Sequence, residues 1–85
     1  MNNQTDAELL KRYLAEGAEE AFAALVERHL ALVHGVALRH LNDPALAQEV
    51  TQNVFITLAR RAVWLTGHPS LGGWLYRTSV HLAQH

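Results

Sequence analysis

The sequence has no cysteine, which excludes disulfide bonds, thiolate metal sites and a cysteine nucleophile. Only two prolines and five glycines are present, and no glycine-rich phosphate loop is among them. No apolar run reaches the roughly 20 residues of a membrane span. The N-terminus lacks the basic start and the apolar core of a secretory signal. We therefore expect a cytoplasmic protein, in a reducing compartment, that does not enter a membrane.

Charge of either sign is also scarce. Charged residues are 18% of the 85 residues, and the formal net charge is −1 with neutral histidines. A domain that binds nucleic acid by itself is usually basic, so this balance argues against a free-standing DNA-binding domain. Apolar residues, at 49%, indicate a globular chain that forms one domain with a modest core.

Start and stop signals divide the chain into four predicted helices and no strands. Thr5 and Glu8 form a capping box at the start of the first helix, and Gly17 is suited to end it. The second predicted helix covers roughly residues 18–40, with apolar side chains at helical spacing. These patterns predict an all-α fold, a compact bundle of four helices.

Two further predicted helices follow. Asn42 or Asp43 caps the third, which continues to about Arg61. We expect residues 62–69 to form a connecting loop, because a glycine and a proline near its end disfavour a helix. Ser70 then caps a fourth helix. This helix directs one set of side chains inward: Leu71, Trp74, Leu75, Thr78 and Leu82.

The third predicted helix has two different faces, at about 100° per residue. One sector is the expected core face and contains Ala47, Val50, Val54, Leu58 and the stem of Arg61. The opposite sector mixes polar and apolar side chains: Glu49, Gln52 and Ile56, flanked by Gln48, Phe55 and Ala59. Exposed apolar anchors among hydrogen-bonding neighbours are typical of a protein-binding surface. The alternative is a central helix in which Phe55 and Ile56 are simply buried.

Four motifs follow one another along the chain: Asp6-Ala7-Glu8-Leu9-Leu10, Ala21-Phe22 with Leu25-Val26 and Arg28-His29, Ala47-x-Glu49-x-x-Gln52-x-x-Phe55, and Gly73-Trp74-Leu75-Tyr76-Arg77-Thr78. In this order and at these intervals, they resemble the second conserved region of extracytoplasmic-function RNA polymerase sigma factors. The resemblance covers residues 6–84. It implies a transcription initiation module that docks on core RNA polymerase and recognises and melts the promoter minus-ten element.

The resemblance further implies that the third helix binds the clamp helices of the polymerase beta-prime subunit. The residues that it places at this interface are Glu49, Gln52, Asn53, Phe55 and Ile56. In that role Glu49 would pair with an arginine of the partner, Gln52 would form amide hydrogen bonds, and Phe55 would be the buried anchor. An anti-sigma factor is a further partner that the family allows, although these residues do not identify one.

A second surface is implied for the non-template strand of the promoter DNA, on the 62–69 loop and the outer face of the fourth helix. Its candidate residues are Arg60, Arg61, Trp64, His68, Tyr76, Arg77 and His81. Arginine suits contacts to phosphate, and Trp64 or Tyr76 suits stacking on an unpaired base lodged by the loop. The alternative for Trp64 is a core residue that anchors the loop, and the inward stripe favours a core position for Trp74.

The six histidines raise a metal site as an alternative, because His81 and His85 lie one helical turn apart. No third ligand is evident, so we expect structural or surface histidines and no metal or other cofactor. Ser70 and Ser79 lack a glycine elbow, and the candidate carboxylates fall in caps and in a solvated turn. We therefore expect a binding protein, not an enzyme.

In the sigma family a basic extension and a helix-turn-helix domain follow region two. The chain ends at His85 without either, so we expect residues 1–85 to be a region-two domain without its C-terminal partner. Two other functions stay open from the sequence. One is a helical protein-interaction domain, a regulator or decoy, without DNA binding. The other is a helix-turn-helix protein that binds DNA alone, against which the near-neutral charge counts.

Overall fold

The computed structural model describes residues 3–84. It contains five helices and, within those residues, no strand: α1 (Asp6–Glu16), α2 (Glu19–Leu41), α3 (Pro44–Arg60), α4 (Ala62–Leu65) and α5 (Leu71–Ala83). The all-α prediction is confirmed, and the count of four helices is approximate. The additional helix, α4, is a single turn inside the segment that the sequence predicted to be a loop.

The turn of α4 forms because its backbone and its apolar side chains are both satisfied there. The N–H groups of Trp64 and Leu65 donate to the carbonyl oxygen of Arg61 at 3.0 and 3.1 Å. Ala62 and Leu65 are buried and hold the turn against the core. The predicted loop is therefore confined to residues 66–70.

Polar caps fix where the long helices begin. The capping box of α1 is complete: the backbone N–H of Thr5 donates to Glu8 Oε1 at 2.8 Å, and that of Glu8 donates to Thr5 Oγ1 at 3.1 Å. The Asp43 carboxylate accepts from two backbone N–H groups in the first turn of α3. Asn42 takes a left-handed conformation, with φ at 51°, and ends α2. Asp43 is thus the N-cap of α3, which the sequence left open between these two residues.

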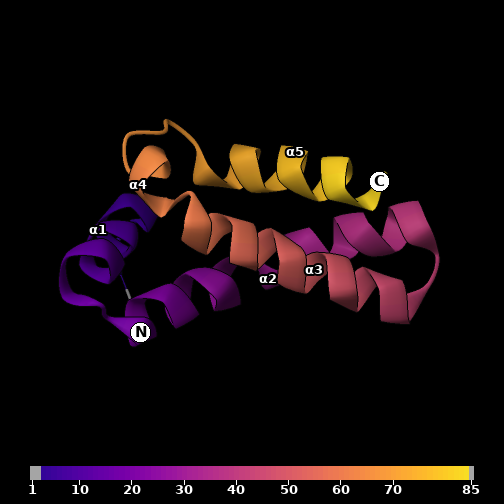
Figure 1. The fold of residues 1–85 in the computed structure, drawn as a ribbon, viewed down its shortest axis with the longest axis horizontal. Helices are drawn as coiled ribbons and strands as arrows, with labels where there is room; N and C mark the ends of the chain where they lie inside the picture. The colour runs from indigo at the N-terminus through magenta and orange to yellow at the C-terminus, as the bar shows by residue number, and fades with distance from the viewer. Residues whose placement is uncertain (1–2, 85) are drawn as a thin grey trace.

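Three helices form the body of the molecule, and two lie at one end (Figure 1). α2 and α3 run side by side as an antiparallel hairpin, and α5 lies along both of them. α1 and α4 lie together at the end where α2 begins, and the C-terminus of α5 lies toward the turn between α2 and α3. Because α2 and α5 both contact α3, α3 is packed by two helices.

The core face of α3 is wider than the sequence predicted. Ala47, Val54 and Leu58 are fully buried as expected, whereas Arg61 is exposed. Two further residues of α3 are buried that the predicted core face did not include: Thr51, which is 6% exposed, and Phe55, which is 7% exposed. Thr51 tolerates burial because its hydroxyl donates to the carbonyl oxygen of Ala47 at 2.7 Å. Packing by both α2 and α5 explains the wider buried arc.

The inward face of α5 follows the predicted stripe. Leu71 and Leu75 are buried, and Trp74 packs partly buried against the core, as favoured for it. Ser79 is also fully buried, which the stripe did not include. Its hydroxyl donates to the carbonyl oxygen of Leu75 at 2.6 Å, so the buried oxygen has a partner.

α2 is the one helix of the described residues that is long and apolar enough, by length and composition, to cross a membrane. By uninterrupted apolar runs alone the sequence predicted no such segment. In this fold α2 contacts α1, α3 and α5, and Leu25, Val33 and Val36 are completely buried among them. Packing in the bundle accounts for only part of this apolar character, because Leu30, Leu32 and Leu38 on the same helix are exposed.

Candidate functional site

The first candidate surface is a groove between α2 and α3. Two adjoining hollows of about 680 and 440 Å³ share Leu30, Thr51 and Gln52 in their walls. The remaining lining of this α2–α3 groove is mostly apolar: Phe22, Val26, Ala31, Phe55, Ile56 and Ala59, with Glu27, His34 and Gln48 at the polar end. Two adjoining hollows with an apolar floor and a polar end suit the side chains of another helical protein.

Phe55 corrects the predicted docking face. It is only 7% exposed and belongs to the core cluster, so it is not a projecting anchor. Ile56 is the exposed apolar residue of this face, at 49%. The sequence alternative, in which both residues are buried, is therefore right for Phe55 and wrong for Ile56. Phe55 reaches the surface only as part of the groove floor.

The other predicted docking residues are exposed but divide between two grooves. Gln52 lies in the wall of the α2–α3 groove. Glu49 and Asn53 instead line a hollow of about 360 Å³ between α3 and the ends of α2 and α5. The exposed ridge of α3, defined by Glu49, Gln52, Asn53 and Ile56, thus stands between two grooves.

The second candidate surface is centred on α4. Trp64 is 82% exposed, and its neighbour Val63 is 69% exposed. The interpretation of Trp64 as a core residue that anchors the loop is therefore wrong, because Ala62 and Leu65 fill that role on the opposite face of the turn. Arg60 and Arg61, just before α4, are both exposed. An exposed indole that follows two exposed arginines in the chain suits stacking on a base together with contacts to phosphate.

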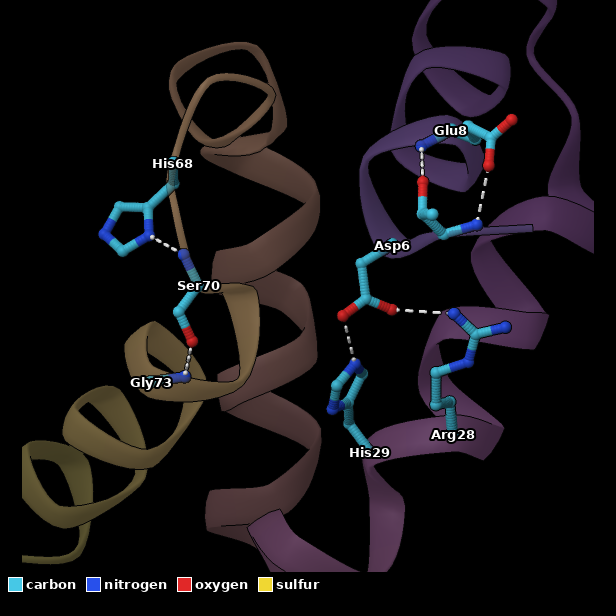
Figure 2. Close-up of polar contacts among 8 residues, drawn as sticks. Asp6, Glu8, Arg28, His29, His68, Ser70 and Gly73 are labelled. Carbon is cyan, nitrogen blue, oxygen red and sulfur yellow. Dashed lines mark hydrogen bonds and ion pairs between the residues drawn. The ribbon is translucent and has the colours of Figure 1, made fainter. Parts of the chain in front are cut away.

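The segment after α4 is held by its own polar contacts. The backbone N–H of Ser70 donates to His68 Nδ1 at 3.1 Å, and Ser70 Oγ accepts from the N–H of Gly73 at 3.0 Å (Figure 2). His68 is half-buried. Because the Ser70 bond to His68 uses Nδ1, a proton on this ring, in the neutral state, belongs to Nε2.

The remaining candidates lie on α5, where Tyr76, Arg77 and His81 are all exposed. Nη1 of Arg77 comes within 3.5 Å of the position that a Cβ would take on Gly73. The Arg77 guanidinium therefore reaches back toward the start of α5 and the 66–70 segment. His81 lies one turn further from that segment than Arg77.

A cluster that the sequence analysis did not assemble joins α1 to α2. Asp6 accepts from Arg28 Nη1 at 3.0 Å and from His29 Nε2 at 2.9 Å (Figure 2). Asp6 belongs to the first of the four sequence motifs, and Arg28 and His29 belong to the second, but their spacing in sequence does not predict that they meet. Only the packing of α1 across α2 brings them together. Within the described residues, no group of three or more histidine, aspartate and glutamate side chains is placed to hold a metal ion. His85, half of the alternative metal pair, lies outside those residues.

Fold and surfaces together define an all-helical domain with two exposed candidate binding surfaces. The family model described as Sigma-70 region 2 matches residues 25–85, and the chain belongs to this family. No solved structure is significantly similar to it.

Three related sigma factors agree with this family. An ECF RNA polymerase sigma factor SigK from Mycobacterium sp. (strain KMS) is 40% identical over 58 residues, which is 68% of this chain and 30% of the relative. SigK of Mycolicibacterium vanbaalenii is 36% identical over 70 residues, 82% of this chain and 35% of the relative. The RNA polymerase sigma-H factor of Pseudomonas aeruginosa is 28% identical over the whole chain and 44% of its own length. The chain therefore spans less than half of these relatives.

Proposed function

We propose that this chain is the region-two module of an extracytoplasmic-function sigma factor. In this role it docks on core RNA polymerase through the beta-prime clamp helices and recognises and melts the promoter minus-ten element. The observation that carries the proposal is the exposed ridge of α3 beside the α2–α3 groove, in a chain of the Sigma-70 region 2 family. The proposed mechanism is binding without chemistry, in the cytoplasm.

Docking would use the ridge and the groove together. Ile56 supplies an apolar contact that is half solvent-exposed in the free protein, and Gln52 supplies amide hydrogen bonds at the same edge. Glu49 and Asn53 face the α3–α5 side, so a partner that contacts all four must lie over the ridge. A pair of helices is broad enough to do this, and an arginine from it would pair with Glu49. The groove floor, including Phe55, would then lose its remaining contact with water.

Polymerase binding would place α4 and α5 next to opening DNA. Single-stranded bases stack on exposed aromatic side chains, and Trp64 is the most exposed of the large hydrophobic residues described. Arg60, Arg61 and Arg77 would neutralise phosphates around it. Capture of unpaired bases stabilises the melted strand, because a ligand that binds only the open state shifts the equilibrium toward it.

The docking proposal is tested by the double substitution Gln52→Ala with Ile56→Ala. We expect at least about a tenfold loss of affinity for purified core polymerase, because truncation of interface residues near the centre commonly costs more than about 1.4 kcal/mol. The measurement is a titration of labelled protein with core polymerase. Leu14→Ala, at a similarly exposed leucine on α1, is the matched control and should bind normally. Wild-type affinity of the double variant, with unchanged helical content, would refute docking through this ridge.

A protein-interaction domain without DNA binding is the second candidate, and the formal net charge of −1 favours it. It shares the docking surface and differs only at α4 and α5. A measurement of DNA binding in the presence of core polymerase distinguishes the sigma module from the interaction domain.

A further inference from the structure

The Asp6 carboxylate joins the start of α1 to the middle of α2 through two charge-assisted contacts. It accepts from Arg28 Nη1 at 3.0 Å and from His29 Nε2 at 2.9 Å (Figure 2). Because a carboxylate can only accept, His29 Nε2 carries the hydrogen in this contact. The His29 side chain is 13% exposed and that of Asp6 is 28% exposed. The orientation of the imidazole is thus determined by a partner on another helix.

The ring atom next to Nε2 faces α5. His29 Cε1 lies 4.0 Å from the position that a Cβ would take on Gly72, in the first turn of α5. His29 therefore stands between the N-terminal ends of two helices, α1 and α5. A rotation of the ring that broke the bond to Asp6 would also change what lies against the start of α5.

Asp6 and His29 form one wall of a cleft of about 400 Å³, with Thr5 and Ala7 beside them. The other wall runs from the end of α4 through the 66–70 segment into the first turn of α5, and its lining residues are Leu65, His68, Pro69, Ser70, Leu71 and Gly72. Leu65 and Leu71 are buried and anchor the two ends of this segment. Between them, the polar contacts of His68 and Ser70 fix the segment internally. The middle of the 66–70 segment lies across the cleft from the Asp6–His29 pair.

We propose that Asp6 and His29 are positioning residues for promoter binding. Asp6 orients His29, and His29 sets the wall that the 66–70 segment and the first turn of α5 face. The 66–70 segment carries His68, α5 carries Arg77, and α4, which directly precedes the segment, carries Trp64, so their placement for an unpaired strand depends on the pair. This inference rests on the proposed function, and it adds α1 to the elements that control the DNA-binding surface.

The test measures DNA affinity in the complex with core polymerase. The probe is a single-stranded DNA that the wild-type chain with core polymerase selects from a random-sequence pool. Asp6→Asn weakens the acceptor, and His29→Phe keeps a ring but removes the donor. We expect each to lose about threefold to thirtyfold in DNA affinity, the range typical of residues that act through others. Binding to core polymerase and helical content should not change.

Two controls separate positioning from a merely structural role. His29→Gln places an amide donor near the former Nε2 and should restore most of the DNA affinity. Glu20→Gln breaks the other described ion pair between α1 and α2, in which Arg12 lies 2.6 Å from Glu20, and should bind DNA normally. In nuclear magnetic resonance spectra, the Ser70 and Gly73 amide signals should shift in Asp6→Asn and stay in place in Glu20→Gln.

The outcomes are separable. Normal DNA affinity of Asp6→Asn and His29→Phe, or equal losses in Glu20→Gln, would overturn the positioning role. So would a parallel loss of core-polymerase binding, which would indicate general destabilisation. If the wild-type chain selects no DNA from the pool, the promoter-binding part of the proposed function fails, independently of Asp6 and His29.

Discussion

At the scale of single residues, Phe55 and Ile56 show how neighbours in sequence take opposite roles. They differ by about 100° around α3, and the edge of the buried arc falls between them. Phe55 is in the core cluster and Ile56 is half-exposed on the ridge. A substitution of Phe55 therefore reports on folding, whereas a substitution of Ile56 reports on the surface.

Phe55→Ala should lower the free energy of unfolding by about 3–5 kcal/mol, because it removes a buried ring and leaves a cavity. Ile56→Ala should lower it by only about 1 kcal/mol, since half of that side chain is already in water. Urea denaturation followed by circular dichroism measures both. Equal effects of the two substitutions would contradict the burial difference between them.

At the scale of an element, α1 is a short helix whose first turn is determined by its cap. The Glu8 carboxylate accepts from the Thr5 backbone N–H, and this bond, followed by that to the Thr5 side chain, lowers the Glu8 pKa from its ordinary value of 4.5. A carboxylate whose pKa is lower in the folded state adds stability above its unfolded pKa. That contribution disappears as the pH falls through the folded value.

The cap therefore makes a testable contribution to the pH dependence of stability. Wild-type protein should be more stable than Glu8→Gln at about pH 6, and the difference should shrink toward about pH 3 as the carboxylate becomes protonated. Thermal unfolding of both proteins across this range provides the measurement. A difference that stays constant with pH would mean that the charged form is not favoured by the cap.

At the scale of the whole molecule, the two candidate surfaces lie on different elements of one small body. The ridge belongs to α3, and the most exposed aromatic residue belongs to α4 at the end where α1 also lies (Figure 1). With a formal net charge of −1, the molecule has little long-range attraction for DNA. Binding to polymerase would supply the local concentration of DNA that the charge does not.

Trp64 should report DNA binding only in the complex. With core polymerase and the selected single strand, we expect a change in tryptophan fluorescence that Trp64→Phe abolishes although Trp74 remains. Without core polymerase, the change should be much smaller. Trp64→Ala should weaken DNA binding by about 1–3 kcal/mol, the usual cost of losing one stacked base.

Val63→Ala is the matched control for Trp64, because Val63 is also strongly exposed on the same turn. It should bind DNA nearly as well as wild type. An absence of any DNA-dependent change with core polymerase present would favour the interaction domain without DNA binding.

The sequence by itself determined the four longer helices, because their signals are local. The caps at Thr5, Asp43 and Ser70 act within one turn, and apolar spacing marks which face turns inward. It also determined the family, since the motifs and their order along the chain can be recognised without a structure. The same spacing placed Glu49 and Gln52 on the face opposite the core, and both are exposed.

Only the tertiary structure decided what depends on contacts between elements. Phe55 is buried because α3 is packed by both α2 and α5, and Trp64 is exposed because Ala62 and Leu65 take the inward face of α4. The Asp6–His29 pair exists because α1 crosses α2, which brings together side chains that are far apart in sequence. A periodic pattern fixes directions around one helix axis, but the number and placement of its neighbours decide how wide its buried arc becomes.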